Sequence, residues 1–490
     1  MLVGLEVEHN DGPWTRPDDY RRVNGLVRYT AGDAVNGFSI TGMGYRATWD
    51  SSDQVPQRAI DSVLIVRFGT IDASDGGDTY RYSGSLEWQR SRRNSSTKVV
   101  AYGFGYDLNL YSNFTFFLDD AERGDQFHQA DHRLVSGAKV THTRIGRFAD
   151  REMRNTVGLQ VRSDDIAKVG LYHTQARDLI DTVRQDDVLQ TSLSGYAQNE
   201  TSWAPKVRTL AGLRVDGYRF RVASDYQVNS GTVRAGIVSP KGGVVLGPFR
   251  GTELYANIGL GFHSNDARGA TITRDPSTGG AADPVTPLVR AQGAEVGVRT
   301  VAVPHLQTTL TIWSLLLASE LLFVGDAGTT EAGRPSHRYG FELANYYAPR
   351  PWLTLDADAS WSSSHFTDSD PAGDHIPGSV QAVISGGATV QDLRHLFGSV
   401  RLRYFGPRPL IEDGSIRSKA TSLLNAEIGY QVTNSVKLLL DVFNCLNGKG
   451  SDIDYYYASR LPGEPPGGVD DIHLHPTIPR TARVSLIVGF

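Results

Sequence analysis

The sequence lacks most of the signals that would point to a soluble enzyme or a helical membrane protein. One cysteine in 490 residues, Cys445, excludes a disulfide framework and a multi-cysteine metal site. Cys445 ends an apolar, strand-like segment with no catalytic motif around it, so we do not expect a nucleophile there. No stretch approaches a charge-free apolar run of about 20 residues, which excludes helical membrane spans. The best candidate, Thr308 to Val324, contains Glu320 and begins with alternating β-branched residues.

Charge and motifs exclude further classes. The net charge of −5 offers no basic surplus for a nucleic acid. The sequence has no phosphate-binding glycine loop, no nucleophile elbow and no zinc-binding His-Glu-x-x-His helix. We therefore predict that the protein is not an enzyme and needs no cofactor.

Apolar and polar residues alternate along many segments. In Glu253 to His263 one face carries Leu254, Ala256, Ile258, Leu260 and Phe262, and the other carries the polar residues and glycines. A period of two indicates an extended strand. The same pattern occurs in Thr79 to Gln89 and in Trp352 to Ser362. A soluble sandwich would pack the apolar face on a second sheet, whereas an outer-membrane barrel turns it to lipid and keeps a polar lumen.

About twenty segments have the length of a tilted membrane crossing. We predict strand centres near residues 5, 26, 43, 84, 102, 136, 157, 195, 213, 236, 257, 295, 311, 342, 357, 385, 400, 427, 440 and 486. Connections after even-numbered strands are short, as at Ala348 to Pro351. Those after odd-numbered strands are long, polar and glycine-rich: Asp50 to Gly77, Asn109 to Gln126, Asp164 to Asp187, Ser264 to Pro287, Asp326 to Ser336, Phe366 to Pro377, Pro407 to Lys419 and Cys445 to Pro479.

This alternation of loop lengths is typical of an outer-membrane barrel, with short periplasmic turns and long external loops. An even number of strands places both termini in the periplasm. The final segment, Thr481 to Phe490, puts Ala482, Val484, Leu486, Val488 and Phe490 on one face and ends on an aromatic residue. We therefore predict an all-β, transmembrane antiparallel β-barrel.

Three segments resemble the barrel of TonB-dependent receptors. Asn425 to Tyr430, Leu440 to Asn447 and the final strand are similar to that family's closing strands. Tyr255 to Asn257, followed by Gly261 to Gly269, resembles a mid-barrel strand that emerges into an external loop. The resemblance implies a 22-stranded barrel in the outer membrane of a Gram-negative bacterium, with an N-terminal plug in the lumen. It also implies energy-coupled uptake of a scarce ligand, such as an iron–siderophore complex.

The chain departs from the family pattern at its start. Met1 to His9 reads as a strand and not as a cleavable leader. We expect residues 1–490 to form one barrel domain of about 20 strands, with the plug domain and the first hairpin missing. The TonB complex would then be reached only through the missing plug. A passive channel, a surface-binding barrel or a non-functional truncated transporter are the alternatives.

The expected partners are outer-membrane lipid and a small ligand such as a metal chelate. Ligand-binding candidates are His263, Asn265, Asp266 and Arg268, which lie where a lumen-facing strand enters a long external loop. The alternative is that they pin the loop by hydrogen bonds to one another. Arg401 and Arg403 alternate onto the lumen face of their strand, where they could attract an anionic ligand or pair with plug carboxylates.

Two acidic regions are weaker candidates for metal sites. His473 and His475, beside Asp470 and Asp471, share one face of an extended segment and could bind a metal. The other reading is a solvated loop, and we predict no resident metal. Calcium at Asp368, Asp370 and Asp374 is a further possibility, although their spacing is not that of an EF-hand.

Overall fold

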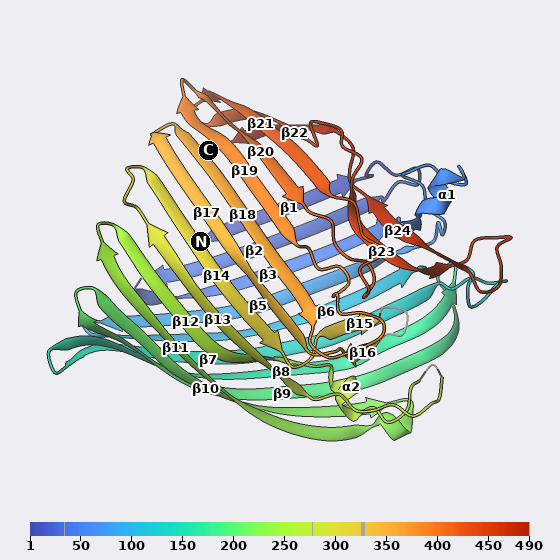
Figure 1. The fold of residues 1–490 in the computed structure, drawn as a ribbon, viewed down its shortest axis with the longest axis horizontal. Helices are drawn as coiled ribbons and strands as arrows, with labels where there is room; N and C mark the ends of the chain where they lie inside the picture. The colour runs from blue at the N-terminus through green and yellow to red at the C-terminus, as the bar shows by residue number, and fades with distance from the viewer. Residues whose placement is uncertain (34, 277, 325–328, 490) are drawn as a thin grey trace.

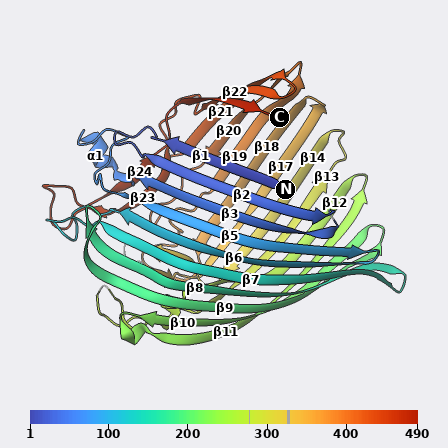
Figure 2. The same cartoon turned by 180° about the vertical axis from the view of Figure 1, so that it is seen from behind.

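A single antiparallel sheet of 20 strands curls into a barrel in the computed structural model of the protein (Figures 1 and 2). The structure describes residues 1–33, 35–276, 278–324 and 329–489. Each strand pairs with the next strand of the barrel along the chain, so the sheet is an up-and-down meander. Among the described residues, no helix is long and apolar enough to cross a membrane.

The barrel strands follow one another around the sheet in chain order, and the strands missing from this series belong to the loops. Their bounds are β1 (Leu2–Asn10), β2 (Tyr20–Gly32), β3 (Asn36–Asp50), β5 (Gly76–Arg92), β6 (Ser95–Ser112), β7 (Phe127–Phe148), β8 (Arg151–Gln175), β9 (Asp178–Ala204), β10 (Val207–Ser224), β11 (Gly231–Phe249), β12 (Thr252–Ser264), β13 (Leu288–Thr300), β14 (Leu306–Leu317), β17 (Ser336–Arg350), β18 (Leu353–Phe366), β19 (Ala382–Leu393), β20 (Leu396–Phe405), β21 (Thr421–Thr433), β22 (Val436–Phe443) and β25 (Thr481–Val488). Every predicted strand centre falls inside one of these strands.

The loops carry the remaining elements. These are β4 (Val55–Pro56), α1 (Gln57–Asp61), the 3-10 turn η1 (Gln227–Asn229), α2 (Ala267–Thr271), β15 (Leu321–Val324), β16 (Thr329–Ala332), β23 (Ser451–Ser459) and β24 (Val469–Pro476). β15 and β16 form a small hairpin, and β23, β24 and β4 form a three-stranded sheet.

The predicted faces are confirmed where the barrel is regular. Leu254 and Ile258 are 47% and 67% exposed, as lipid-facing side chains should be in the absence of lipid. Asn257, between them in sequence, instead donates a hydrogen bond to Glu295 of the next strand on the inner face, at 2.8 Å. Tyr82, Leu86 and Trp88 of β5 are also exposed on the outer face. Side-chain alternation therefore separates an apolar outside from a polar inside.

Both described ends of the barrel lie beside short turns. Leu2 pairs with Arg28, close to the turn that follows β2, and Val488 pairs with Val436, next to the turn before β22. This agrees with the prediction that the termini lie on one side. The predicted aromatic end, Phe490, and part of the predicted loop from Asp326 to Ser336 lie outside the described residues.

The first and last strands do not pair with each other in the part of the chain that the structure describes. β1 pairs only with β2, and β25 pairs only with β22. The external loops span this seam: β4, from the loop after β3, pairs with β24, from the loop before β25. Arg58 strengthens the contact, because its guanidinium donates to Glu464 at 2.8 Å and its backbone N–H donates to Asp471 at 2.8 Å.

The prediction of a long loop from Asp164 to Asp187 is wrong. β8 continues to Gln175 and β9 begins at Asp178, so the connection is the two-residue turn Ala176–Arg177. Both residues have positive φ, 50° and 70°, as a type I′ hairpin turn requires. The usual Asn-Gly or Asp-Gly signal is missing. The strands are polar here, and this polarity resembles that of a loop.

The lipid-facing assignment of Phe262 is also wrong. The pairing of β11 with β12 ends at Lys241–Gly259, and β12 then leaves its neighbour. Phe262 packs edge-on against Tyr218, which is on the inner face of β10, with ring centroids 6.0 Å apart. It borders a buried apolar cluster inside the barrel: Val188, Phe220, Val222, Ile237, Ala267 and Leu288. The end of β12 thus turns inward and carries α2 against the inner wall.

Candidate functional site

Arg–Asp ion pairs line the inner wall of the barrel at its external end. In each pair the two residues are separated by one residue in sequence. In the pairs that lie on strands, this spacing points both side chains to the same face. Four adjacent strands and the α2 loop contribute one pair each: Asp131–Arg133 on β7, Arg162–Asp164 on β8, Arg184–Asp186 on β9, Arg214–Asp216 on β10, and Asp266–Arg268 before and in α2. We call them the Arg–Asp pairs.

Several of these pairs have the two-pronged geometry that makes an arginine–carboxylate contact strong. The Nε and Nη2 atoms of Arg162 donate to Asp164 at 2.8 and 2.7 Å. Asp216, whose side chain is completely buried, accepts from Arg214 at 2.7 Å and from Ser194 at 2.6 Å. The sequence signal is Arg-x-Asp or Asp-x-Arg within an alternating strand. Only the last pair is among the predicted ligand-binding residues.

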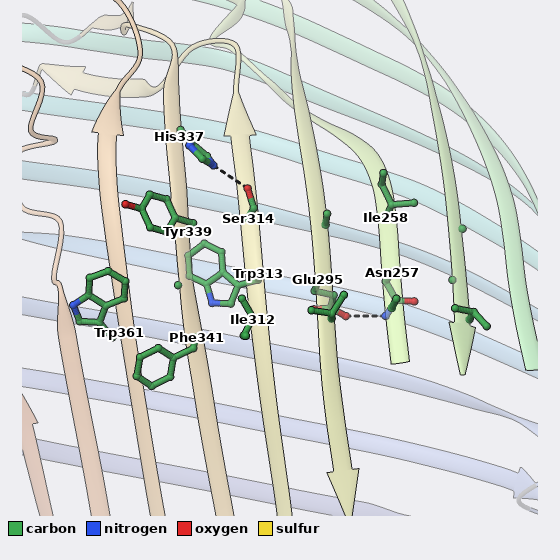
Figure 3. Close-up of a pocket in the computed structure, with 17 residues that line it drawn as sticks. Asn257, Ile258, Glu295, Ile312, Trp313, Ser314, His337, Tyr339, Phe341 and Trp361 are labelled. Atoms are coloured by element: carbon green, nitrogen blue, oxygen red, sulfur yellow. Dashed lines mark hydrogen bonds between the residues drawn. The ribbon is translucent and has the colours of Figure 1, made fainter. Parts of the chain in front are cut away.

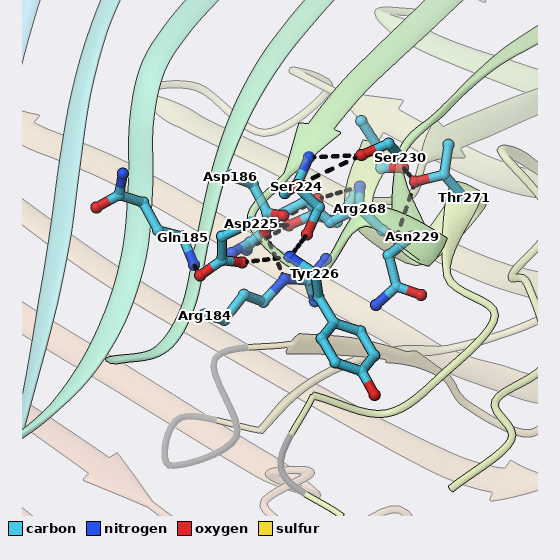
Figure 4. Close-up of polar contacts among 12 residues, drawn as sticks. Arg184, Gln185, Asp186, Ser224, Asp225, Tyr226, Asn229, Ser230, Arg268 and Thr271 are labelled. Atoms are coloured by element: carbon cyan, nitrogen blue, oxygen red, sulfur yellow. Dashed lines mark hydrogen bonds and ion pairs between the residues drawn. The ribbon is translucent and has the colours of Figure 1, made fainter. Parts of the chain in front are cut away.

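The Arg184–Asp186 pair is the most deeply buried. The side chains are 1% and 0% exposed, and they lie beneath α2 and the end of β10 (Figure 4). Nε of Arg184 donates to Asp186, but both terminal nitrogens of Arg184 and Oδ1 of Asp186 lack a hydrogen-bond partner among the residues that the structure describes. A buried guanidinium with unused donors is costly unless opposite charge compensates it. Asp186 supplies that charge here.

The predicted ligand residues at the start of the α2 loop pin the loop. Asp266 caps α2 by accepting from the backbone N–H of Arg268 at 2.8 Å, and its carboxylate also holds the Arg268 guanidinium. Burial would raise the pKa of Asp266, but the charge and hydrogen bonds of Arg268 outweigh burial and hold it below its ordinary value. Asn265 donates to the carbonyl of Thr286 at 2.7 Å, which joins the two ends of the loop.

Two polar atoms near this loop have no partner among the described residues. They are Nε2 of His263 and Oδ1 of Asn265. Asn229, completely buried in η1, fixes the far side of the loop by accepting from the backbone N–H groups of Thr273 and Arg274 at 2.9 and 3.0 Å. The loop is therefore held at both sides. Ligand binding by His263, Asn265, Asp266 and Arg268 stays a prediction.

Arg401 and Arg403 both lie on the inner face of β20, but they differ in their partners. Arg401 forms a two-pronged ion pair with Asp356 of β18, at 2.7 and 2.8 Å, across the intervening β19. Arg403 is exposed on the same face. No ion pair within the described chain engages it. The wall itself therefore neutralises Arg401, and Arg403 keeps a free charge.

A basic pocket of about 410 Å³ lies further into the lumen, lined by Lys139, Arg214, Lys241, Tyr196 and Ser239. Nζ of Lys139 lies 5.8 Å from the centre of the Tyr196 ring. Two glycines leave space for these side chains. A Cβ on Gly158 would lie 2.4 Å from Tyr196, and one on Gly212 would lie 2.9 Å from Lys241.

The pocket combines free charge with an unused hydroxyl. Ser239 is 8% exposed, and its Oγ has no hydrogen-bond partner within the described part of the chain. Lys139 and Lys241 have no ion-pair partner among the described side chains, and no carboxylate lines the pocket. The arrangement suits an anionic group.

An apolar hollow of about 830 Å³ lies on the outer face, over β12 to β18 (Figure 3). Ile258, Ile312, Phe341 and Trp361 line it. Its outward polar contact is the hydrogen bond between Ser314 and His337, at 2.9 Å. Since exposed apolar side chains dominate this surface, we assign it to contact with lipid chains and not to ligand recognition.

The structure separates the residues of the weaker metal candidates. His473 is completely buried, stacks on Tyr457 at 3.7 Å and shares a hydrogen bond with Ser459 at 2.7 Å. Burial lowers the pKa of His473 to about 3. His475 instead lies against Trp14, with ring centroids 4.7 Å apart.

The three candidate calcium ligands also have separate partners. Arg334 holds Asp368 at 2.8 Å, Asp370 accepts from the backbone of Ala372, and Asp374 lies beside His365 and His375. His9, Asp11 and Asp19 are the group of described residues with metal-ligand spacing, and sequence analysis did not identify it. His9 and Asp11 are exposed.

Comparison with solved structures gives the fold. The ferric-catecholate import receptor Fiu from E. coli K12, in its closed form, matches with a TM-score of 0.76 and 12% identity over 100% of this chain and 77% of that chain. The ferric yersiniabactin uptake receptor FyuA from Yersinia pestis matches with a TM-score of 0.76 and 14% identity, over 100% and 75%. The ferric citrate transporter FecA, unliganded, has a TM-score of 0.79 and 12% identity, over 99% and 72%.

Sequence comparison gives the family. No curated protein matches the chain. The family model described as TonB dependent receptor-like, beta-barrel, matches residues 8–445, which is most of the chain. That range contains the Arg–Asp pairs and the basic pocket. The three segments quoted above predicted the same family. The protein therefore belongs to the TonB-dependent receptors, whose β-barrel its chain forms.

Proposed function

We propose that this barrel takes up a negatively charged metal chelate, such as an iron–siderophore complex, across the outer membrane of a Gram-negative bacterium. The family consists of outer-membrane receptors that work with TonB, and the structural neighbours are named for ferric catecholate, ferric yersiniabactin and ferric citrate. We propose the same energy coupling here, transmitted through a plug domain inside a barrel domain of residues 1–490.

The observation that carries the proposal is the unequal charge balance of the inner wall. The Arg–Asp pairs and Arg401 are neutralised by neighbouring carboxylates. Lys139, Lys241 and Arg403 are not. Free cations in a confined lumen attract anions. Because no carboxylate lines the basic pocket, Lys139 and Lys241 would present net positive charge to a ligand that enters it.

The direct test is uptake of a radiolabelled ferric chelate by cells that lack or carry the intact gene, with and without a protonophore. The proposal predicts uptake that needs both the gene and the proton gradient. Uptake that is indifferent to the gradient would contradict it and favour a passive channel. Steady conductance of the purified protein in a planar bilayer, unchanged by added plug domain, would support that alternative.

A further inference from the structure

The outer surface carries an arginine pair at the external edge of the apolar band. Arg219 of β10 and Arg234 of β11 face each other directly across the two strands. Both are exposed, and both share the outer face with Leu213, Val215 and Val238. The pairing of β10 with β11 shows no register shift from Val207 to Val222, so the alternation that places them outside is unbroken.

Like charges directly opposite each other destabilise an antiparallel pair. Among the described side chains, no hydrogen bond or ion pair engages Arg219 or Arg234. On β9, Arg219 faces Thr191, which is neutral. On the other side, β12 pairs with β11 only from Lys241 onward, so no described strand pairs with β11 at Arg234. The sheet therefore holds two guanidinium groups together without supplying an anion.

Acidic side chains on this face lie elsewhere. Asp187 is diagonal to Arg221, the next outward residue of β10, and Asp165 lies one strand further away, opposite Leu189. These carboxylates offset Arg221 in part. They do not face the Arg219–Arg234 pair.

The depth of the pair fits the membrane interface. A barrel strand needs about 9–11 residues to cross the hydrocarbon core, and β10 starts at Val207 on the short-turn side. The crossing then ends near Gly217, and Arg219 follows it. Gly217 pairs with Gly236, two residues from the arginine pair on the same outer face. Neither glycine has a side chain, so the backbone is uncovered between the arginines and the exposed apolar residues.

We propose that Arg219 and Arg234 bind the phosphate groups of a phosphorylated glycolipid in the outer leaflet of the membrane, with an acyl chain lying over Gly217 and Gly236. Two guanidinium forks can hold phosphate oxygens from both sides. The bound phosphate supplies the missing counter-charge between the strands. This contact is with the surrounding membrane and goes beyond ligand uptake through the lumen.

The test measures binding of fluorescent lipid A to the purified full chain in detergent micelles. The proposal predicts at least tenfold tighter binding of bisphosphorylated than of dephosphorylated lipid A. R219Q/R234Q should lose that preference. R92Q/R93Q should keep it, because it removes the same charge from exposed arginines at the other end of the barrel. R219K/R234K, which keeps the charge but loses the fork, should bind several-fold more weakly than the wild type.

Three results would overturn the proposal. The first is equal binding of the two lipids by the wild type, and the second is an unchanged preference in R219Q/R234Q. The third is displacement of the lipid by inorganic phosphate at equal concentration, which would indicate a site for a free anion. Folding of each variant is checked by heat-modifiable migration on gels. If R219Q/R234Q does not fold, R219K/R234K decides, and wild-type affinity in that variant would count against the site.

Discussion

Arg184 and Asp186 form an ion pair that is buried on the inner face of β9. Their side chains are 1% and 0% exposed, because α2 folds inward over them (Figure 4). The charge of Arg268 reaches Asp186, and that of Arg184 reaches Asp266. The loop that closes the site and the wall beneath it are therefore electrostatically linked.

Removing one partner of this pair should destabilise the barrel. Arg184→Met leaves the Asp186 carboxylate buried with only the more distant charge of Arg268 to offset it, and we expect a loss of about 3 kcal/mol in the free energy of unfolding. The measurement is denaturant unfolding in micelles. The double variant R184M/D186L should regain much of the loss, because neither charge is then buried alone.

The matched control for that experiment is Arg154→Met. Arg154 lies 3.7 Å from Glu200, and the side chains are 56% and 40% exposed. An exposed pair contributes at most about 1 kcal/mol. Equal losses for R184M and R154M would show that the buried pair has no special weight.

The loop sheet over the seam should depend on Arg58. Its guanidinium contacts Glu464 and Ser459, and its backbone contacts Asp471, so Arg58→Ala removes the guanidinium contacts and leaves the backbone contact. We expect faster proteolysis within residues 51–75 and 451–476 and unchanged protection of the barrel strands. Arg123→Ala is the control, because its partner Asp120 belongs to the same loop. Equal cleavage rates in R58A and the wild type would be the contrary result.

Acid should loosen the same loop sheet through His473. Burial lowers the pKa of His473 from 6.5 to about 3, so the unfolded loop binds a proton that the folded loop rejects. The contribution of neutral His473 to the stability of the loop sheet is complete above pH 6.5 and falls as the pH drops toward 3. At pH 5 the loss is about 2 kcal/mol. The pKa of Glu464 is held below its ordinary 4.5, chiefly by its hydrogen bond from Arg58, so this carboxylate acts only at lower pH.

Hydrogen exchange of the β23 and β24 amides at pH 7.5 and pH 5, corrected for intrinsic rates, measures this effect. Protection should fall at pH 5 in the wild type. In His473→Gln this fall should be absent, because the raised pKa of Asp53, about 6, favours proton binding by the folded loop and stabilises it as the pH drops. A wild type with the same protection at both values would refute the role of His473.

Arg403 should matter more for ligand affinity than Arg401. A charge at about 4 Å in water contributes about 1 kcal/mol, so Arg403→Gln should weaken binding of an anionic ferric chelate about fivefold. Arg401→Gln should change affinity less, because Asp356 already neutralises Arg401. The measurement is equilibrium binding to whole cells. A larger effect of R401Q than of R403Q would contradict the assignment of the free charge.

The strands and their faces could be predicted from the sequence because membrane crossing imposes a period of two on every strand. Ile258 and Asn257 illustrate this: neighbours in sequence, they lie on opposite faces. Strand ends could not be predicted where the barrel leaves the bilayer. Beyond that boundary the outer face is no longer apolar, so the polar stretch around Ala176 and Arg177 looks like a loop although it is a hairpin.

The site could be predicted only in part, since its contacts depend on three-dimensional neighbours. The alternation that places Arg401 on the inner face does not reveal Asp356, two strands away. It also cannot show that β12 turns inward and buries Phe262 against Tyr218. The Arg-x-Asp pattern was present in the sequence, and its recurrence on neighbouring strands became informative only once the register was known.

The most direct test of the account uses single cysteines at positions 255 to 259 of β12 in a Cys445→Ser background, each carrying a spin label in lipid vesicles. The account predicts that labels at 256 and 258 collide with oxygen in the hydrocarbon, whereas labels at 255, 257 and 259 collide with a water-soluble nickel complex. Equal accessibility at all five positions would contradict the barrel, and with it the polar lumen on which the proposed uptake depends.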